Sequence, residues 1–212
     1  MTVDTFVALH ARLAPVPFVP EVRLHQADDA IGLWEATEDL LGGRQEPPFW
    51  AFAWAGGQAL ARYVLDHPDL VAGRRVLDLA SGSGLVAVAA ARAGAATVRA
   101  VDVDPLALEA VALNAAANGG GVTTELADLL DGDAGGCDVV LAGDVFYSRD
   151  LATRMQAFLR RAHRDGAAVY AGDPGRAYLP ADLGERVAVY DVPTATSLES
   201  VPERRTAVWR VA

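Results

Sequence analysis

The sequence lacks lysine altogether, contains a single cysteine and has no long hydrophobic run. Because Cys137 is the only cysteine, no disulfide can form within the chain. A membrane-spanning helix needs about 18 or more consecutive apolar residues, and no such run is present. The chain also opens without a basic, Ser-rich or signal-like segment. We therefore expect a soluble, cytoplasmic protein with no membrane partner.

Positive charge is scarce as well. The 18 basic residues are all arginines, 28 acidic residues outnumber them, and the net charge is −10. Binding to a phosphate backbone needs clustered basic side chains that displace counterions, so we expect no nucleic-acid partner. The same negative charge would favour encounters with a cationic or amphoteric substrate, such as a protein surface that carries lysine.

The segment from residue 75 to residue 105 is the most informative part of the chain. A short apolar run at 76–79 stops at a Gly/Ser cluster, which predicts a buried parallel strand that ends in a tight turn. The small residues at 85–93 suit a helix packed directly on a sheet, and a second apolar run follows at 98–101. This pattern predicts a βαβ unit, and open α/β sheets bind ligands at the carboxyl ends of such strands.

The turn of this unit favours a nucleoside ligand. Glycine at positions 82 and 84 lets the backbone approach a ligand closely, because a Cβ atom there would collide with it or forbid the dihedral angles. We place Ser81, Gly82 and Gly84 in the cofactor site. Asp102 ends the second strand, where a carboxylate can accept hydrogen bonds from ribose hydroxyl groups.

Asp78 distinguishes between two nucleoside cofactors. Glycine turns that bind a pyrophosphate present bare N–H groups, and a carboxylate aimed at that space would repel the phosphates. A cationic ligand would instead be attracted, and S-adenosylmethionine carries both an ammonium and a sulfonium group. The spacing Gly82-x-Gly84-x-x-Ala87 also satisfies the dinucleotide pattern, so a NAD-binding oxidoreductase remains the alternative. Asp78, together with the long segment before this strand, favours the methyl donor.

The remaining chain predicts one α/β domain of 212 residues with a full hydrophobic core. We expect residues 1–45 to form a small N-terminal cap, with a helix at 4–14 that ends at Pro15, a strand at 21–26 and an apolar helical segment at 28–41. The core at 46–212 is predicted to be a Rossmann-like, seven-stranded, mostly parallel sheet with an antiparallel final strand and helices on both faces. Its further strands are expected at 122–126, 138–142, 167–171, 186–192 and 206–211, and its further helices begin after Gly57, at Asp104-Pro105 and at about Leu151.

Four segments together give a more specific resemblance. They are Trp50 to Tyr63, Asp78 to Gly84, Gly143-Asp144-Val145-Phe146-Tyr147 and Gly172-Asp173-Pro174-Gly175-Arg176. The chain resembles the class I, seven-strand protein lysine methyltransferases with an Asp/Glu-x-x-Tyr/Phe motif. Among them it is most similar to the electron transfer flavoprotein β-subunit lysine methyltransferases of the bacterial type. One departure is Ala80, where the family often has glycine. Base-methylating enzymes usually carry prolines where this chain has Val145-Phe146.

This resemblance implies S-adenosylmethionine as cofactor and a lysine of the electron transfer flavoprotein β-subunit as methyl acceptor. It implies that Asp128 bonds the exocyclic amine of adenine, although a solvated loop acid is the alternative. Trp54 is expected to line the cofactor pocket, with core packing an equal possibility. No metal is expected. A ribosomal protein, a small amine such as nicotinamide, and a non-catalytic cofactor-binding scaffold remain alternative assignments.

The chemistry explains why an acid and a ring suit the acceptor site. With a reference pKa of about 10.4, a lysine amine costs about 4.6 kcal/mol to deprotonate at pH 7. Desolvation lowers this cost, whereas a carboxylate alone would raise it by stabilising the ammonium. We therefore expect Asp144 to capture and orient the amine, Tyr147 to shape the slot, and water to take the proton. The alternative for Asp144 is an N-cap of the helix that follows.

Overall fold

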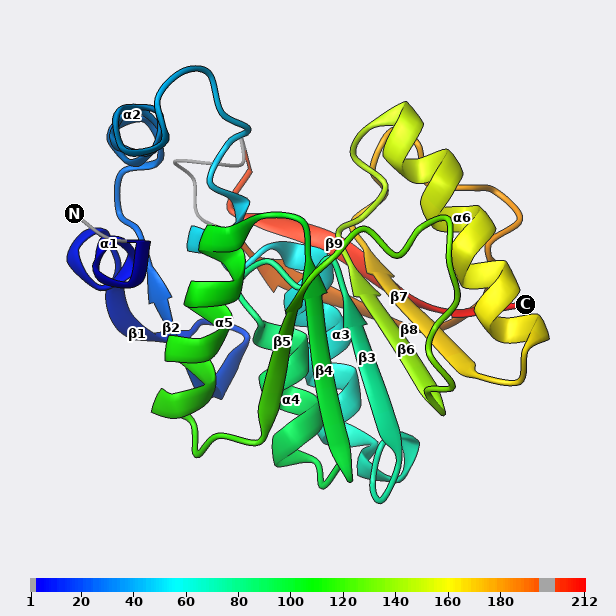
Figure 1. The fold of residues 1–212 in the computed structure, drawn as a ribbon. Helices are drawn as coiled ribbons and strands as arrows, with labels where there is room; N and C mark the ends of the chain where they lie inside the picture. Colours follow the sequence, from blue (N-terminus) through cyan, green and yellow to red (C-terminus); the bar gives the residue numbers. More distant parts are fainter. Residues whose placement is uncertain (1–2, 195–200) are drawn as a thin grey trace.

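A seven-stranded sheet forms the centre of the computed structural model, which describes residues 3–194 and 201–212 (Figure 1). The strand order is β5-β4-β3-β6-β7-β9-β8. Only β9 among the described strands of this sheet runs against its neighbours. The predicted fold class is therefore confirmed. The strands are β3 (Arg75–Leu79), β4 (Thr97–Asp102), β5 (Val122–Leu126), β6 (Val139–Gly143), β7 (Ala168–Asp173), β8 (Gly184–Pro193) and β9 (Glu203–Val211).

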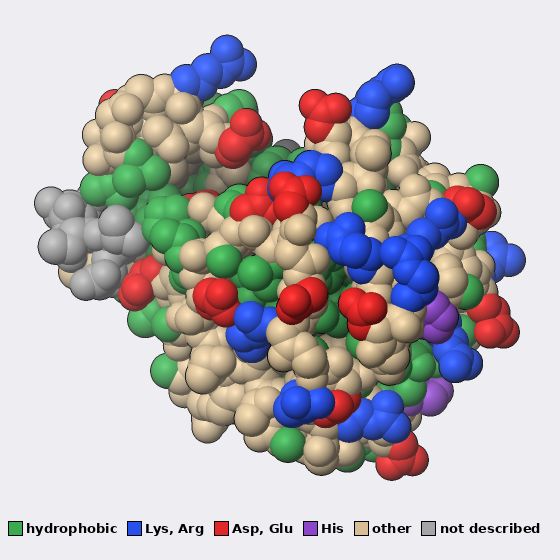
Figure 2. All heavy atoms as spheres, turned by 45° about the vertical axis from the view of Figure 1, so that its right-hand side comes forward, with side chains coloured by type: hydrophobic (Ala, Val, Ile, Leu, Met, Phe, Trp, Pro, Cys, Tyr) green, Lys and Arg blue, Asp and Glu red, His purple; other side chains and the backbone are tan. Residues whose placement is uncertain are grey.

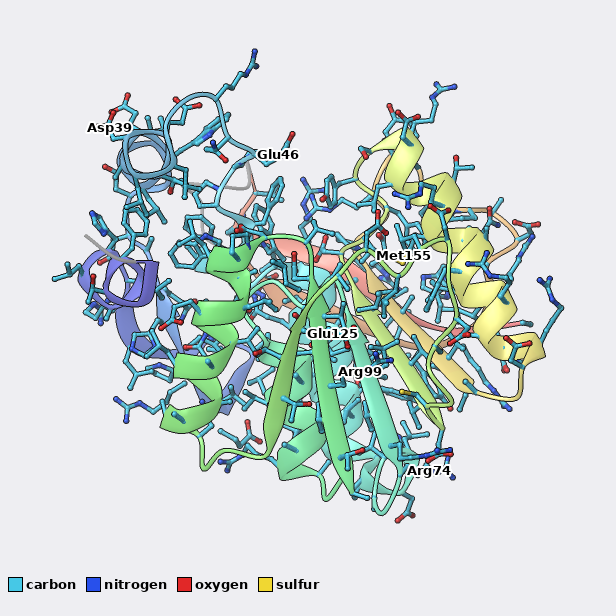
Figure 3. All side chains as sticks on the ribbon, in the orientation of Figure 1. Asp39, Glu46, Arg74, Arg99, Glu125 and Met155 are labelled. Atoms are coloured by element: carbon cyan, nitrogen blue, oxygen red, sulfur yellow. The ribbon has the colours of Figure 1, made fainter. Side chains whose placement is uncertain are left out.

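Helices cover both faces of this sheet because its central strands are apolar on both sides. In β6, Val139 and Leu141 belong to one buried cluster and Val140 and Ala142 to another, as alternation along a strand requires. The first cluster includes residues of α3 (Ala55–Asp66), α4 (Leu85–Arg92) and α5 (Pro105–Ala117). The second includes α6 (Arg149–Arg164), which lies on the opposite face (Figure 1). Met155 of α6 is buried against the sheet (Figure 3).

The N-terminal segment corrects one prediction. Helix α1 (Val3–His10) ends four residues earlier than expected, and Leu13 and Pro15 lie in β1 (Arg12–Val16), which pairs with β2 (Val19–Gln26). The physical reason is the pairing of residues 12–16 with β2, which buries Val16 and Val19 and takes the place of helical hydrogen bonds. The apolar spacing overstated the helix, since Leu9 is 69% exposed.

The rest of the N-terminal segment follows the prediction more closely. The strand expected at 21–26 is β2, and the apolar segment at 28–41 contains α2 (Ala30–Leu41). Phe6 and Val7 of α1 share a buried cluster with residues of α5 and of the short helix η1 (Phe49–Ala51). A second short helix, η2 (Pro68–Leu70), follows α3. Across the described ranges, no helix is both long enough and apolar enough to cross a membrane.

The topology brings the candidate residues to one edge of the sheet. Because β3, β4, β5, β6 and β7 are parallel, their carboxyl ends lie together. Asp102 is in register with Leu126, and Gly143 is in register with Gly172. Figure 1 shows the loop before η1 and the start of α6 at this same edge. The residues predicted for the site therefore lie at this edge.

Candidate active site

The turn after β3 has the backbone geometry that its glycines suggested. Ala80, Gly82 and Gly84 all have positive φ angles, of 53°, 51° and 75°. A Cβ atom added to Gly82 would meet no atom within 4 Å, so the space in front of this turn is open. One added to Gly84 would lie 3.0 Å from the Val111 side chain. Ala80, where the family often has glycine, pays a conformational cost of about 1 kcal/mol for its left-handed backbone.

Asp102 closes this turn from the neighbouring strand. Its Oδ2 atom accepts the Gly82 N–H at 2.8 Å, and its Oδ1 atom accepts the N–H groups of Val103 and Asp104 at 2.8 and 3.1 Å. Oδ2 therefore keeps one acceptor position, because a carboxylate oxygen can accept two hydrogen bonds. Asp104 has the predicted structural role, since its side chain caps α5 by accepting the Leu106 N–H at 2.8 Å.

Asp78 lies deeper than the turn. Its side chain is 1% exposed, and Oδ2 accepts the N–H of Ala87 in the first turn of α4 at 2.9 Å. Burial raises the pKa of this carboxyl group well above its usual value, and the negative charge of Asp102 adds to the rise. The structure thus gives Asp78 a structural partner, an otherwise unbonded N–H group at a helix start. It also leaves the carboxylate in an environment that favours a nearby cation.

Asp144 follows β6 and makes the densest set of polar contacts at this edge. It is 8% exposed, and its Oδ1 atom accepts hydrogen bonds from Nε and Nη2 of Arg176, both at 2.7 Å. Its Oδ2 atom accepts the N–H of Gly56 in the first turn of α3. The N-cap of α6 is Ser148, so the alternative role of Asp144 as the cap of the following helix is wrong. Asp144 instead binds a free N–H group at the start of α3.

Arg176 is held in this position by the loop after β7. Oδ1 of Asp173 accepts the N–H groups of Gly175 and Arg176 at 2.6 and 2.7 Å. Oδ2 of Asp173 is buried without a hydrogen-bond partner among the described residues. Burial, with the charge of Asp144 adding to it, raises the pKa of Asp173 to about 6. The guanidinium carbon of Arg176 lies 5.7 Å from the centroid of the Trp54 ring.

Glycines allow α3 to approach the sheet closely enough for these contacts. A Cβ atom added to Gly56 would lie 2.3 Å from the carbonyl oxygen of Gly172, and one added to Gly172 would lie 2.1 Å from that of Gly56. One added to Gly143 would lie 2.8 Å from the Cα atom of Gly57. The sequence analysis missed this packing and the Asp144–Arg176 pair. The glycine before each acid, at 143 and 172, was the available signal.

Aromatic rings line the same edge. The Phe49 ring lies 5.2 Å from that of Tyr147 and 5.8 Å from that of Trp54, measured between centroids. The indole N–H of Trp54 donates to the carbonyl oxygen of Phe49 at 2.9 Å. Tyr147 is 47% exposed, and desolvation together with the charges of Asp102 and Glu46 raises its pKa. Figure 3 labels Glu46 on the loop before η1, at the same end of the sheet.

Asp128 and Ser81 occupy the two sides of the β4 end. Oδ1 of Asp128 accepts the Leu130 N–H at 3.0 Å, and Oδ2 pairs with Arg154 at 2.9 Å. The Leu130 N–H and the Arg154 guanidinium together lower the pKa of this half-exposed carboxyl group. The hydroxyl group of Ser81 lies 3.4 Å from the carbonyl oxygen of Val101. Both residues therefore border the edge that carries Asp102.

Two hollows are lined by residues outside the glycine turn. One of about 640 Å³ lies against α2 and includes Trp34, Glu38 and Arg44. Another of about 210 Å³ reaches Trp54 and Gln58 at the start of α3. Only the second touches a predicted site residue. The turn itself is defined by its backbone geometry and by Asp102.

Comparison with known proteins places this arrangement in a family. The electron transfer flavoprotein beta subunit lysine methyltransferase of Xenopus laevis is 35% identical over 97% of this chain and 85% of its own length. This chain belongs to that family. The Rattus norvegicus member is 37% identical over 90% of this chain and 76% of its own length. The resemblance inferred from the four sequence segments is thus confirmed, and the chain is a class I methyltransferase.

More distant matches come from other methyltransferases. The model of the ribosomal protein L11 methyltransferase family matches residues 58–162. The L11 methylase structure from Lactobacillus delbrueckii has a TM-score of 0.53 and 21% identity, and the match covers 76% of this chain and 81% of that one. A magnesium protoporphyrin IX methyltransferase from Synechocystis, solved with S-adenosylmethionine bound, has a TM-score of 0.52 and 17% identity over 74% and 78%. These structures share the fold.

Proposed function

We propose that this methyltransferase uses S-adenosylmethionine to methylate lysine side chains of the electron transfer flavoprotein β-subunit. The proposal rests on its family and on one observation, a buried carboxylate beside aromatic rings at the sheet edge that carries the glycine turn. Because β3 and β6 are neighbouring strands, Asp144 and the turn after β3 lie at adjacent strand ends. This is the juxtaposition that transfer between a bound nucleoside cofactor and an amine requires.

The residues at the β3 and β4 ends fit the proposed cofactor. The open space in front of Gly82 admits a ligand against the backbone, and Oδ2 of Asp102 has an acceptor position for a ribose hydroxyl group. Ser81 and Gly84 belong to the same turn. We assign Asp78 to the positive end of the cofactor, Trp54 to the pocket wall and Asp128 to the adenine amine. When bound, S-adenosylmethionine supplies a methyl group on a sulfonium centre.

Asp144 and Tyr147 are the proposed acceptor residues. Asp144 accepts a hydrogen bond from the amine and fixes its direction, while the partly exposed ring of Tyr147 shapes the slot through which the lysine side chain enters. The amine reacts in its neutral form, so its proton leaves to water before transfer. Holding the neutral amine in one orientation supplies most of the acceleration.

The test is methyl transfer from labelled S-adenosylmethionine to purified electron transfer flavoprotein β-subunit, with mass spectrometry to locate the label. We expect label on lysine with the wild type. We expect Asp144→Ala to abolish nearly all transfer while calorimetry shows cofactor binding roughly intact. Asp182→Asn, which alters a surface partner of Arg160, is the matched control and should transfer at the wild-type rate. Unchanged turnover in Asp144→Ala would remove Asp144 from the mechanism.

A ribosomal protein is the second candidate acceptor. It is favoured by the family model matched at residues 58–162 and by a Bacillus pumilus ribosomal protein L11 methyltransferase, 32% identical over 67% of this chain and 44% of its own length. Labelled donor added to an extract from a strain lacking this enzyme separates the candidates. Label in the flavoprotein subunit supports the main proposal, label in a ribosomal protein the second, and label only in small molecules an amine such as nicotinamide.

We also propose that the chain works as one domain in the cytoplasm, with residues 1–45 as a cap on the core at 46–212, and that it has no nucleic-acid partner. The net charge of −10 supports the last point, because phosphate backbones repel an acidic surface. Titration with NAD, followed by fluorescence, tests the oxidoreductase alternative. Saturable NAD binding would contradict the proposed cofactor.

A further inference from the structure

We propose that Arg176 is a positioning residue that neutralises Asp144, so that Asp144 can orient the target amine without holding it as an ammonium ion. The inference rests on the proposed function, since it concerns the amine that Asp144 binds. Binding the amine and keeping it neutral make opposite demands on Asp144. A lone buried carboxylate attracts the amine but stabilises the protonated form, which cannot accept a methyl group.

The geometry places the arginine where it can resolve this conflict. Nε and Nη2 of Arg176 both lie 2.7 Å from Oδ1 of Asp144, and Gly56 donates to Oδ2. In the proposed function, the target amine binds this same carboxylate. It does so beside a guanidinium group, which stays charged at every pH of interest.

Two neighbours fix the guanidinium in this position. Oδ1 of Asp173 accepts the backbone N–H groups of Gly175 and Arg176, which sets the direction in which the Arg176 side chain leaves the loop. The Trp54 ring, 5.7 Å from the guanidinium carbon, lies at the distance of a cation–π contact. Arg176 is thus supported from the loop after β7 and from the segment before α3.

Other ionisable groups surround this pair. Asp173 lies on the same loop as Arg176, and its pKa is raised to about 6, so it is ionised at the alkaline pH where amines lose their proton. Tyr147 follows Asp144 on the chain, with Asp102 of β4 and Glu46 of the loop before η1 near its hydroxyl group. Helix α3 contributes a backbone N–H group from Gly56. Arg176 is the cation that the described structure places directly against Asp144.

The two members of the pair should shift the apparent pKa of the amine in opposite directions. Removing the positive charge leaves Asp144 to stabilise the ammonium ion, so the apparent pKa of the transfer step should rise. Removing the negative charge leaves Arg176 to destabilise the ammonium ion, so the apparent pKa should fall. Charges within 4–6 Å typically move a pKa by about one unit or more. A merely structural role would lower the rate equally at every pH.

The experiment measures single-turnover methyl transfer to the flavoprotein β-subunit from pH 6 to pH 10, with donor and acceptor saturating. We expect Arg176→Gln to raise the apparent pKa by about one unit, which lowers the rate about tenfold at neutral pH and much less at pH 10. Arg176→Lys should restore most of the wild-type profile. Asp144→Asn should lower the apparent pKa, and the double variant Asp144→Asn/Arg176→Gln should return it to the wild-type value.

Arg75→Gln is the matched control, because Arg75 forms a similar pair with Asp138 at the opposite ends of the strands. This variant should leave the pH profile of transfer unchanged. A loss in Arg176→Gln that is independent of pH would overturn the inference. If that variant does not fold, an apparent pKa that stays at the wild-type value in Asp144→Asn would overturn it equally. A wild type that methylates no lysine would refute the proposed function itself, and this inference with it.

Discussion

Asp173 is a carboxyl group that folding buries beside a second carboxyl group. Its pKa rises from 3.8 to about 6, mainly because of burial. The folded protein therefore holds this proton more tightly than the unfolded chain, and keeping Asp173 ionised at pH 7 costs about 3 kcal/mol. This cost is absent below pH 4, grows as the pH rises from about 4 to 6, and is fully present above that range.

We therefore expect Asp173→Asn to become more stable relative to the wild type as the pH rises. Between pH 4 and pH 7.5 the difference in the free energy of unfolding should move by about 2–3 kcal/mol in favour of the variant. Urea unfolding at both pH values measures this change. Asp39→Asn, on the exposed side of α2, is the control (Figure 3). If the difference in the free energy of unfolding is the same at both pH values, folding does not raise the pKa of Asp173.

Asp102 and Asp104 are neighbouring acids to which the structure gives different tasks. Asp102 accepts the Gly82 N–H and faces the proposed ribose position, whereas Asp104 caps α5. We expect Asp102→Ala to weaken S-adenosylmethionine binding about 10- to 100-fold, because a hydrogen bond to a charged group contributes about 1.5–3 kcal/mol. Asp104→Ala should lower stability by about 1 kcal/mol with little change in affinity. Calorimetry and urea unfolding separate the two effects. Equal affinities for Asp102→Ala and the wild type would count against the ribose role.

Helix α3 carries a pair of adjacent glycines with opposite surroundings. A Cβ atom on Gly56 would lie 2.3 Å from the Gly172 carbonyl oxygen and 2.7 Å from Asp144, whereas one on Gly57 would meet nothing within 4 Å. We expect Gly56→Ala to destabilise the protein by about 3 kcal/mol, because the helix must move off the sheet. Gly57→Ala should be neutral or stabilising by up to about 1 kcal/mol. Thermal and urea unfolding compare the two. Equal stabilities would contradict the close approach of α3.

The sequence predicted elements better than it predicted contacts between them. The central strands were recognisable because they are buried on both faces and therefore appear as uninterrupted apolar runs. The helix at 4–14 was overextended because its apolar spacing does not reveal that residues 12–16 pair with β2, and strand β1 was missed with it. The start of α5 was predicted correctly because Asp104-Pro105 is a local signal for a helix N-terminus.

The site was predictable in its local parts only. The glycine turn and the position of Asp102 beside it follow from one βαβ unit, so the sequence was sufficient for both. The Asp144–Arg176 pair joins two strand ends 32 residues apart, and the Gly56–Gly172 contact spans a longer interval. The signals that could have suggested them are the glycine before each acid and the shared edge of parallel strands, which places Asp144 and the 172–176 loop side by side.

Charge across the molecule bears on how an acceptor protein arrives. Arginines on α6 form a visible group on one face, but carboxylates lie among them (Figure 2). Arg154 pairs with Asp128 and Asp131, and Arg160 pairs with Asp182. These pairs largely cancel the positive charge of this face, so the net charge of −10 dominates at long range.

This balance predicts that salt slows the association of the acceptor protein but leaves the transfer step nearly unchanged. We expect kcat/KM for a flavoprotein β-subunit acceptor to fall about tenfold between roughly 20 and 300 mM salt, because screening weakens the steering of a lysine-bearing surface. The single-turnover rate at saturation should barely change, since charges at the buried Asp144 are screened much less. A short peptide with one lysine and no other charged side chain is the control acceptor and should show a much weaker dependence. A kcat/KM that rises with salt would mean that the acceptor approaches against the field of this acidic protein, and that its docking face is not cationic.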